Sequence, residues 1–357
     1  MSTRTSTQSL GDFVRFAINL LHDGTVPEVS ECWQVADRCG VDVIAVADSP
    51  ALLRELWVTT TMCTSDTDSA LIMTGVTNPV TRDPTVTASA LYALHEMAPN
   101  RIALGISTGD SAAWGVGLAP ASVNKLRSYI LAVRGLLAGE EVEYDGRRLR
   151  AHWKGHETVS IPIYVACSGP KALRMAAQHA DGLILSFGFS PDVMDYVTSQ
   201  IADSCAEVGR SPGELDLWWN SEVVFGDTIE QARERNLGVY TGWMTMGSLD
   251  GKLIPSKHRE ALLQLNGDTY DIGGGYQQEN RTAMLVGRAK ELGIYDWLST
   301  MSPGLFGTPD DIAARLIEHG QAGRENWMFY VGHAGENRLE HIRLIGEEVL
   351  PRVRKGM

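Results

Sequence analysis

The stretch IPIYVACSGPKALRMAAQHADGLIL, residues 161–185, decides the fold of this chain. The apolar run IPIYVAC leads into a Ser-Gly-Pro-Lys turn, and a short helix-forming segment follows the turn. That segment ends near Gly182, where a second apolar run begins. The order of strand, helix and strand predicts one β-α-β unit, which is the building block of parallel sheets.

The turn in this unit has the composition of an anion site. Pro170 suits the first position of a helix, which places Ser168 or Gly169 at the N-cap. The unpaired N–H groups of the first helical turn then point along the helix axis, and Lys171 adds a positive charge. A phosphate monoester fits such a geometry. An ordinary capped helix has the same sequence pattern, so both interpretations stay open at this point.

The rest of the chain repeats the alternation of apolar strand and amphipathic helix. Eight such units favour a closed (β/α)₈ TIM barrel over an open sheet, and no G-x-G-x-x-G motif follows the first strand. A hairpin with an Asp-Gly turn is expected at 139–149. Strands are predicted at 13–20, 41–48, 70–79, 101–110, on both sides of the 168–171 turn, at 214–226 and at 326–332, and helices at 29–39, 52–63, 85–97, 122–137, 191–208, 228–238, 308–323 and 339–353.

Two segments fall outside this alternation. Residues 1–12 are polar and are expected to be a flexible tail. Residues 239–306 are Gly-rich and irregular, and they form the largest insertion, placed before the last helix-strand unit. An excursion of this length in a regular chain indicates a functional lid or an inserted helical segment.

Composition excludes several classes of protein. The 357 residues carry a formal net charge of −13, which argues against binding to nucleic acid or to an anionic membrane. The five cysteines are odd in number and contain no C-x-x-C pair, so neither a disulfide framework nor a zinc site is expected. The N-terminus has no apolar signal region, and no apolar run is long enough to span a bilayer. A cytoplasmic protein without a metal is therefore expected.

In a barrel, chemistry is expected at the carboxyl ends of the strands. Asp48 and His333 end strands there and could take part in proton transfer or hydrogen-bond a ring, although a capping or ion-paired role fits them equally. Together with Asn220 they are the catalytic candidates. Arg82 is expected to be a surface charge. No carboxylate pair or triad stands out, which favours an enzyme whose reactive group is a bound cofactor.

Six segments in order resemble the luciferase-like superfamily of flavin- and deazaflavin F420-dependent barrel enzymes. The resemblance covers most of residues 13–350 and is weakest at 239–306. It implies one barrel domain over residues 1–357 with a flavin-type ring at the carboxyl-terminal mouth. The segments are DSPALLRELWVT (48–59), TGVTNPVTRDPTVTASAL (74–91), RIALGISTGDSA (101–112), the helix and hairpin at 126–149, YVACSGPKALRMAAQHADGLIL (164–185) and GTPDDIAARL (307–316).

The resemblance also implies a set of cofactor-binding residues. It places a non-prolyl cis peptide at Gly75-Val76, behind the ring. Two departures from the family pattern stand out: Thr108 replaces an arginine that helps to hold the phosphate in luciferases, and Asp48-Ser49 replaces a histidine at the end of the second strand. The implied cofactor-binding residues are Gly75, Val76, Thr77, Asn78, Ser107, Thr108, Gly109, Ser168, Gly169, Pro170, Lys171 and Ser186.

The leading functional expectation is a two-component monooxygenase. It would take reduced FMN from a separate flavin reductase and use O₂ to oxygenate a small organic substrate, with residues 239–306 closing over the site. The first alternative is an F420-dependent hydride-transfer reductase or dehydrogenase, against which the acidic net charge counts. The second is a non-catalytic flavin-binding relative. A homodimer or higher homo-oligomer is expected.

Overall fold

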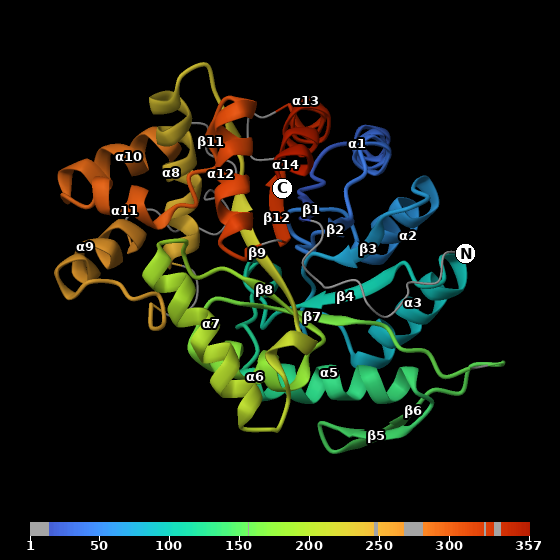
Figure 1. The fold of residues 1–357 in the computed structure, drawn as a ribbon. Helices are drawn as coiled ribbons and strands as arrows, with labels where there is room; N and C mark the ends of the chain where they lie inside the picture. Colours follow the sequence, from blue (N-terminus) through green and yellow to red (C-terminus); the bar gives the residue numbers. More distant parts are fainter. Residues whose placement is uncertain (1–13, 156, 246–248, 268–280, 325, 332–336) are drawn as a thin grey trace.

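Eight parallel strands close into a barrel, as the alternation of elements predicts (Figure 1). Around the barrel the order is β1-β12-β9-β8-β7-β4-β3-β2, so that the first strand pairs with the last. The computed structural model describes residues 14–155, 157–245, 249–267, 281–324, 326–331 and 337–357. The barrel strands are β1 (Arg15–Leu20), β2 (Val43–Val46), β3 (Leu71–Thr74), β4 (Ile102–Ile106), β7 (Ile163–Cys167), β8 (Gly182–Leu185), β9 (Asp216–Glu222) and β12 (Asn326–Val331).

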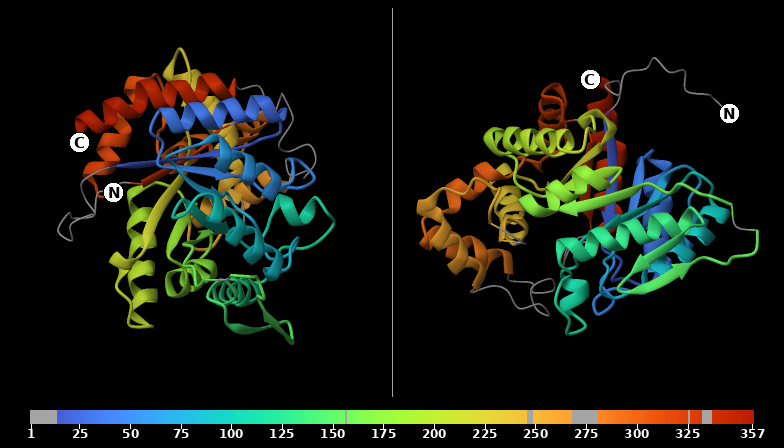
Figure 2. Two further views of the ribbon diagram at one scale, coloured as in Figure 1. Left: turned by 90° about the vertical axis from the view of Figure 1, so that its right-hand side faces the viewer. Right: turned by 90° about the horizontal axis from the view of Figure 1, so that it is seen from below.

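Helices surround the barrel on its outside (Figure 2). Their buried faces pack against the outward-facing side chains of the strands, which gives the larger of the two apolar clusters. They are α1 (Val26–Arg38), α2 (Leu56–Asp66), α3 (Pro84–Met97), α5 (Val123–Leu137), α6 (Pro170–His179), α7 (Pro191–Ala206), α8 (Ile229–Thr245), α12 (Pro309–Gln321), α13 (Arg338–Arg343), the π-helix η2 (Leu344–Val349) and α14 (Leu350–Gly356).

The second predicted helix is displaced along the chain. Helix α2 begins at Leu56 rather than at Leu52, because Glu55 caps its N-terminus by accepting a hydrogen bond from the backbone N–H of Val58. The threonines that weaken the helical pattern are accommodated: the Thr59 and Thr60 hydroxyls donate to the carbonyls four residues earlier. The β-branched run therefore stays helical at positions where its hydroxyls have backbone acceptors.

The hairpin follows the prediction. Strands β5 (Glu141–Tyr144) and β6 (Arg147–Arg150) pair antiparallel beside α5. Asp145 and Gly146 form the turn with φ of 48° and 70°, the left-handed conformation that an Asp-Gly dipeptide supports in a two-residue hairpin.

The insertion is largely helical in its described part, as the expectation of an inserted helical segment at residues 239–306 has it, and it is not irregular there. Helix α8 does not stop near Gly238 but continues to Thr245, and α10 packs against it. The further elements are α9 (Ser256–Gly267), α10 (Arg281–Glu291), α11 (Tyr295–Met301) and a short parallel pair formed by β10 (Val224–Phe225) and β11 (Phe306–Gly307). These helices form a layer beside the barrel (Figure 1).

Alternate strand residues fill the barrel interior and form a second, smaller apolar cluster. Its buried members are Ala17, Val43, Ala45, Met73, Ala103, Tyr164, Ile184, Trp218 and Met328. The residue two positions after each of these on its strand points to the same side, so the interior pattern also names the side chains at the carboxyl-terminal mouth.

A polar network closes the opposite, amino-terminal end of the barrel. The Asp216 carboxylate pairs with Arg15 and accepts hydrogen bonds from the Tyr164 hydroxyl at 2.9 Å and the Trp218 indole N–H at 3.1 Å. The Asn326 amide donates to the same carboxylate at 3.2 Å. The Arg15 guanidinium also lies over the Trp218 ring. These contacts tie β1, β7, β9 and β12 together below the apolar interior.

Candidate active site

The inner face of the barrel mouth carries polar side chains, and some of their buried atoms have no hydrogen-bond partner among the described residues. Asn19, Gly75, Ser186 and Asn220 each lie two positions after an interior residue, so all four face the mouth. The peptide bond between Gly75 and Val76 is cis, as the family resemblance implies. The Asn19 amide donates to the Gly75 carbonyl at 2.7 Å and fixes this bend. A side chain at position 75 would have its Cβ only 2.6 Å from that of Ala45.

Asp48 lies in an ion pair at the rim of the mouth. Its Oδ2 accepts hydrogen bonds from the Thr77 hydroxyl at 2.7 Å and from Arg82 Nη1 at 2.6 Å. Arg82 Nη2 reaches Glu55 at 2.9 Å. Burial alone would lower the pKa of Arg82, but the two carboxylates outweigh burial and raise it. The structure thus gives Asp48 the ion-paired role and shows that Arg82, expected at the surface, is largely buried.

The loops after β3 and β4 lie against one another. The Thr77 N–H donates to the Gly105 carbonyl and the Ser107 N–H donates to the Thr77 carbonyl, both at 2.9 Å. Gly109 has a φ of 97°, and a Cβ there would be 3.3 Å from that of Asn78. These contacts bring together Thr77, Asn78, Ser107 and Gly109, which the family resemblance implies as cofactor-binding residues.

Asn78 is held by its own loop and keeps one unused donor. Its Oδ1 accepts from the backbone N–H groups of Val80 at 2.9 Å and Thr81 at 3.0 Å. Its Nδ2 is buried and has no hydrogen-bond partner among the described residues. A buried donor without a partner costs about 1–3 kcal/mol, which a ligand acceptor would recover.

The 168–171 turn has the predicted backbone. Gly169 is the N-cap of α6 in an extended conformation and Pro170 is the first helical residue. The Lys171 side chain is exposed, so it is the backbone N–H groups that face the turn. Cys167, directly before the turn, is buried, and burial raises the pKa of its thiol well above the ordinary value. Cys167 is therefore a packing residue and not a thiolate nucleophile.

Ser186 and Asn220 meet beside a small cavity. Asn220 Nδ2 donates to the Ser186 hydroxyl at 3.1 Å, while the buried Asn220 Oδ1 has no partner among the described residues. The cavity has a volume of about 10 Å³, enough for one water molecule. Met244 from α8 and the buried Glu222 both line it. Glu222 is a sequence candidate at the carboxyl end of its strand, and it lies on the same face of β9 as Asn220.

Within residues 239–306, the segment that follows α8 contacts the first residue of α6. Gly251 packs on Pro170, and its neighbour Lys252 is fully buried, with Nζ donating to the Met244 carbonyl at 3.1 Å. Burial lowers the pKa of Lys252 to about 7. No periodic signal could have singled out this lysine in a Gly-rich stretch. His333, the third catalytic candidate, lies outside the described residues.

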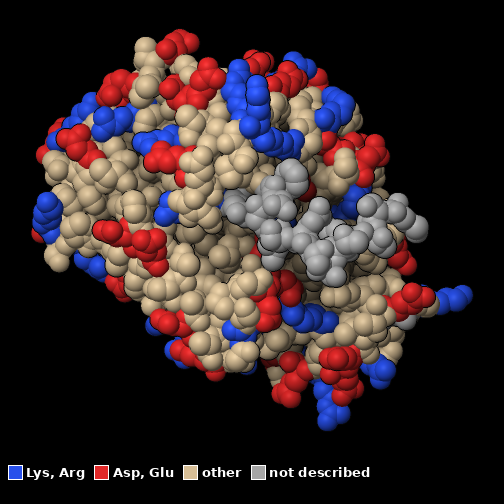
Figure 3. Space-filling view, viewed as in Figure 1, with Lys and Arg blue, Asp and Glu red and all other residues tan. Residues whose placement is uncertain are grey.

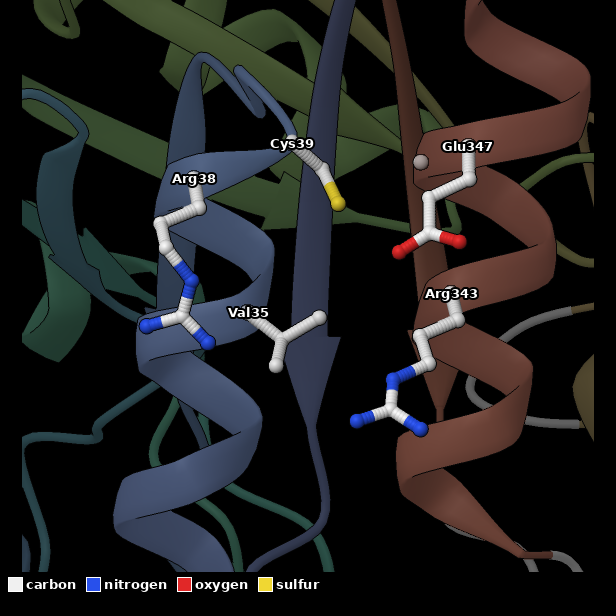
Figure 4. A pocket seen from close by; sticks show the side chains of 6 residues that line it. Val35, Arg38, Cys39, Arg343 and Glu347 are labelled. Carbon is white, nitrogen blue, oxygen red and sulfur yellow. The ribbon is translucent and has the colours of Figure 1, made fainter.

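A second pocket lies between α1 and the C-terminal helices, away from the strand ends (Figure 4). Its volume is about 300 Å³, and Arg38, Arg343 and Glu347 at its edge are exposed. Gly346, in the π-helix, packs on Cys39 at its base. These exposed charges have the character of a solvated surface groove, and no function is assigned to it.

Neither a metal site nor a membrane span is found in the part of the chain that the structure describes. No group of three or more His, Cys, Asp or Glu side chains there could hold a metal ion. No helix there is long and apolar enough to cross a membrane. Figure 3 shows acidic and basic side chains interspersed over one face of the molecule.

A sequence model of the family described as luciferase-like monooxygenase matches residues 11–326. The chain belongs to this family. It is 27% identical to 5,10-methylenetetrahydromethanopterin reductase from Methanolobus tindarius, over 94% of this chain and 99% of the relative. It is 25% identical to F420-dependent glucose-6-phosphate dehydrogenase from Microbacterium testaceum, over 81% and 80%. The solved coenzyme F420-dependent tetrahydromethanopterin reductase from Methanopyrus kandleri has the same fold, with a TM-score of 0.71, 21% identity and coverage of 96% and 99%.

These relatives correct the leading functional expectation. They are named as reductases and dehydrogenases, and F420 stands in two of the names, so the FMN-dependent monooxygenase reading is wrong and the F420 alternative is favoured. Oxidoreductase chemistry is supported. The motifs could not separate the two cofactors, because FMN and F420 share a three-ring system and a phosphate. The net charge of −13 counted wrongly against F420, because the charge of a whole chain does not describe a local site.

Proposed function

We propose that this chain is an F420-dependent oxidoreductase that transfers a hydride between the deazaflavin and a small-molecule substrate. The observation that carries the proposal is the similarity to a methylenetetrahydromethanopterin reductase over nearly the full length of both chains. F420-dependent enzymes recur among the relatives and the structural neighbours. Reduction of a methylene-pterin is the reaction class that the first relative's name favours.

The barrel mouth suits a ligand of this kind. Three buried asparagines carry an amide atom without a partner among the described residues: Asn19 Oδ1, Asn78 Nδ2 and Asn220 Oδ1. One donor and two acceptors match a ring whose edge carries both carbonyl and N–H groups. Gly109 supports the same reading, because a Cβ there would fill the space beside Asn78.

Each group of mouth residues then has a role toward the cofactor. The backbone N–H groups that follow Gly169 would hold the phosphate, with Ser168 beside them. Gly75 and Val76 would support the ring from behind. When bound, F420 supplies the carbon that accepts or donates the hydride. The residues proposed to contact the ring and its side chain are Thr77, Asn78, Ser107, Thr108, Gly109 and Ser186.

The remaining residues would orient these contacts. Asp48 fixes the Thr77 hydroxyl and is itself fixed by Arg82, which makes it a positioning residue in this proposal. Asn220 would hydrogen-bond the bound ligand through its unpaired oxygen. The described part of the insertion would exclude water, since Met244 already lines the small cavity beside Asn220.

The test begins with binding. Fluorescence titration with F420 and, separately, with FMN should give a clear preference for F420. With reduced F420 and 5,10-methylenetetrahydromethanopterin, the absorbance of the oxidised cofactor should then rise. With oxidised F420 and glucose 6-phosphate, it should fall. Tight binding of FMN with no detectable binding of F420 would overturn the proposal.

A further inference from the structure

The residues proposed to contact the cofactor ring, its side chain and its phosphate occupy one half of the barrel mouth. They follow β3, β4, β7 and β8, which are four consecutive strands in the closed order of the barrel. The other four strands, β9, β12, β1 and β2, are also consecutive and bound the opposite half. A hydride passes directly between two molecules in contact, so the second substrate must share the mouth with the ring. The half bounded by β9, β12, β1 and β2 is therefore where the chain can contact that substrate.

A row of three side chains crosses this half of the mouth. Tyr330 on β12 is paired in register with Asn19 on β1 and with Glu222 on β9. Tyr330 lies two positions after the interior residue Met328, just as Asn19 lies two positions after Ala17. Because side chains alternate between the faces of a strand, the whole row faces the mouth. Tyr330 is its centre, on the strand opposite β4 in the closed order.

Tyr330 differs from its two neighbours in accessibility. Asn19 and Glu222 are 1% and 2% exposed, whereas Tyr330 is half-buried. Since β12 lies within the closed barrel and is covered by helices outside, the exposed part of Tyr330 faces the mouth. A phenol hydroxyl can both donate and accept a hydrogen bond. Tyr330 therefore presents a polar group that a molecule in the mouth can reach.

Three other titratable side chains near the ends of these strands are less suited to exchange a proton with a substrate. The Asp48 carboxylate is held by Arg82 at 2.6 Å. His22 is 1% exposed, and its ring nitrogens face backbone carbonyls. Glu222 is buried beside the small cavity. Among these groups, only Tyr330 combines a proton donor with access to the mouth.

We propose that Tyr330 hydrogen-bonds the substrate heteroatom next to the carbon that exchanges the hydride, and that it exchanges a proton with this heteroatom. The inference rests on the proposed function, because it assigns a residue to the second substrate of the same site. It gives the half of the mouth across from the cofactor a catalytic residue.

The step balances in atoms and electrons. Hydride addition to the carbon breaks one of its bonds to nitrogen or oxygen, and the electron pair of that bond stays on the heteroatom. The heteroatom takes the proton of the phenol, so the substrate gains two electrons and the cofactor loses them. Tyr330 then regains a proton from solvent at the mouth. In the oxidation of an alcohol each transfer runs in reverse.

The experiment uses Tyr330→Phe, which removes a single oxygen atom. Turnover is measured with reduced F420 and 5,10-methylenetetrahydromethanopterin, and with oxidised F420 and glucose 6-phosphate. It should fall about hundredfold or more, as is typical when a general acid is removed. The dissociation constant for F420, from fluorescence titration, should stay within about twofold of wild type. Tyr196→Phe, at a half-buried tyrosine of the outer helix α7, is the matched control and should equal the wild type in both measurements.

A merely structural role for the hydroxyl predicts other results. The inference is overturned if Tyr330→Phe keeps the wild-type turnover, loses its fold, or binds F420 about tenfold more weakly. A wild type that does not bind F420 contradicts the proposed function itself. If the wild type binds F420 and turns over neither substrate, the proposed reaction class fails and the titrations decide. An unchanged F420 affinity in Tyr330→Phe then supports the division of the mouth, and a weaker one contradicts it.

Discussion

Arg82 and Asp48 form a buried ion pair at the rim of the barrel mouth, with 2.6 Å between Nη1 and Oδ2. The Asp48 side chain is 1% exposed and that of Arg82 is 10% exposed. The pair joins the loop after β2 to the loop after β3, and it also holds the Thr77 hydroxyl. The pair thereby orients the Thr77 hydroxyl at the rim of the mouth.

Removal of Arg82 should destabilise the protein strongly. Arg82→Met leaves the Asp48 carboxylate buried without its cation, for which a loss of about 3–5 kcal/mol in the free energy of unfolding is expected. Urea denaturation followed by circular dichroism measures it. Arg147→Met is the control, because Arg147 pairs with Asp83 at the same 2.6 Å but at the surface. A stability for Arg82→Met equal to that of the control would contradict the role of burial.

Asp216 should stabilise the barrel without affecting the mouth. Its carboxylate is shared by Arg15, Tyr164, Trp218 and Asn326 at the amino-terminal end. Asp216→Ala is expected to lower the free energy of unfolding by about 3 kcal/mol, since several partners lose a charged acceptor together. The dissociation constant for F420, measured at a temperature where the variant is folded, should stay within twofold of wild type. Weakened F420 binding with unchanged stability would be the opposite result.

Removal of the Asn220 side chain should weaken ligand binding without destabilising the free protein. Its Oδ1 is buried without a partner among the described residues, so Asn220→Ala should leave the melting temperature of the free protein unchanged or raise it. The same variant should bind F420 or its reaction partner roughly tenfold more weakly, because one hydrogen bond is lost.

Ser186→Ala provides the comparison for Asn220. It removes the hydroxyl that Asn220 Nδ2 contacts and leaves Oδ1 in place. The free protein should therefore lose stability, by about 1–3 kcal/mol, because a second amide atom becomes unpaired. A pattern in which Asn220→Ala destabilises the free protein and binds F420 normally would show that Asn220 is structural.

Acid should destabilise the fold in part through His22. The ring is 1% exposed, and burial lowers its pKa below the ordinary 6.5 even though the carbonyls of Arg54 and Leu20 act in the opposite direction. Below pH 6.5 the unfolded chain therefore binds the proton more readily than the folded chain does. Stability that is present above pH 6.5 is lost as the pH falls through the folded pKa.

Melting temperatures between pH 7 and pH 5 test this linkage. In His22→Asn the decline in melting temperature over this interval should be shallower than in the wild type. His152→Asn, at an exposed position, should keep the wild-type slope. Equal slopes in all three proteins would rule out His22 as a contributor.

The sequence alone determined the barrel and its local signals. Strands and helices were readable because side chains of period two and period 3.6 must bury one face each. The Asp145-Gly146 turn and the Gly169-Pro170 helix start were readable because few residues fit those backbone conformations. The resemblance placed the cis bond at Gly75-Val76, where the structure has it.

Tertiary structure decided the features that depend on contacts between distant segments. Arg82 is buried where Asp48 and Glu55 lie across from it, and Lys252 is buried with its Nζ on the Met244 carbonyl of α8. Neither residue carries a periodic or turn signal in its own segment. Periodicity indicates which face of a helix or strand is buried. Which residue packs against that face follows only from the tertiary contacts between distant segments.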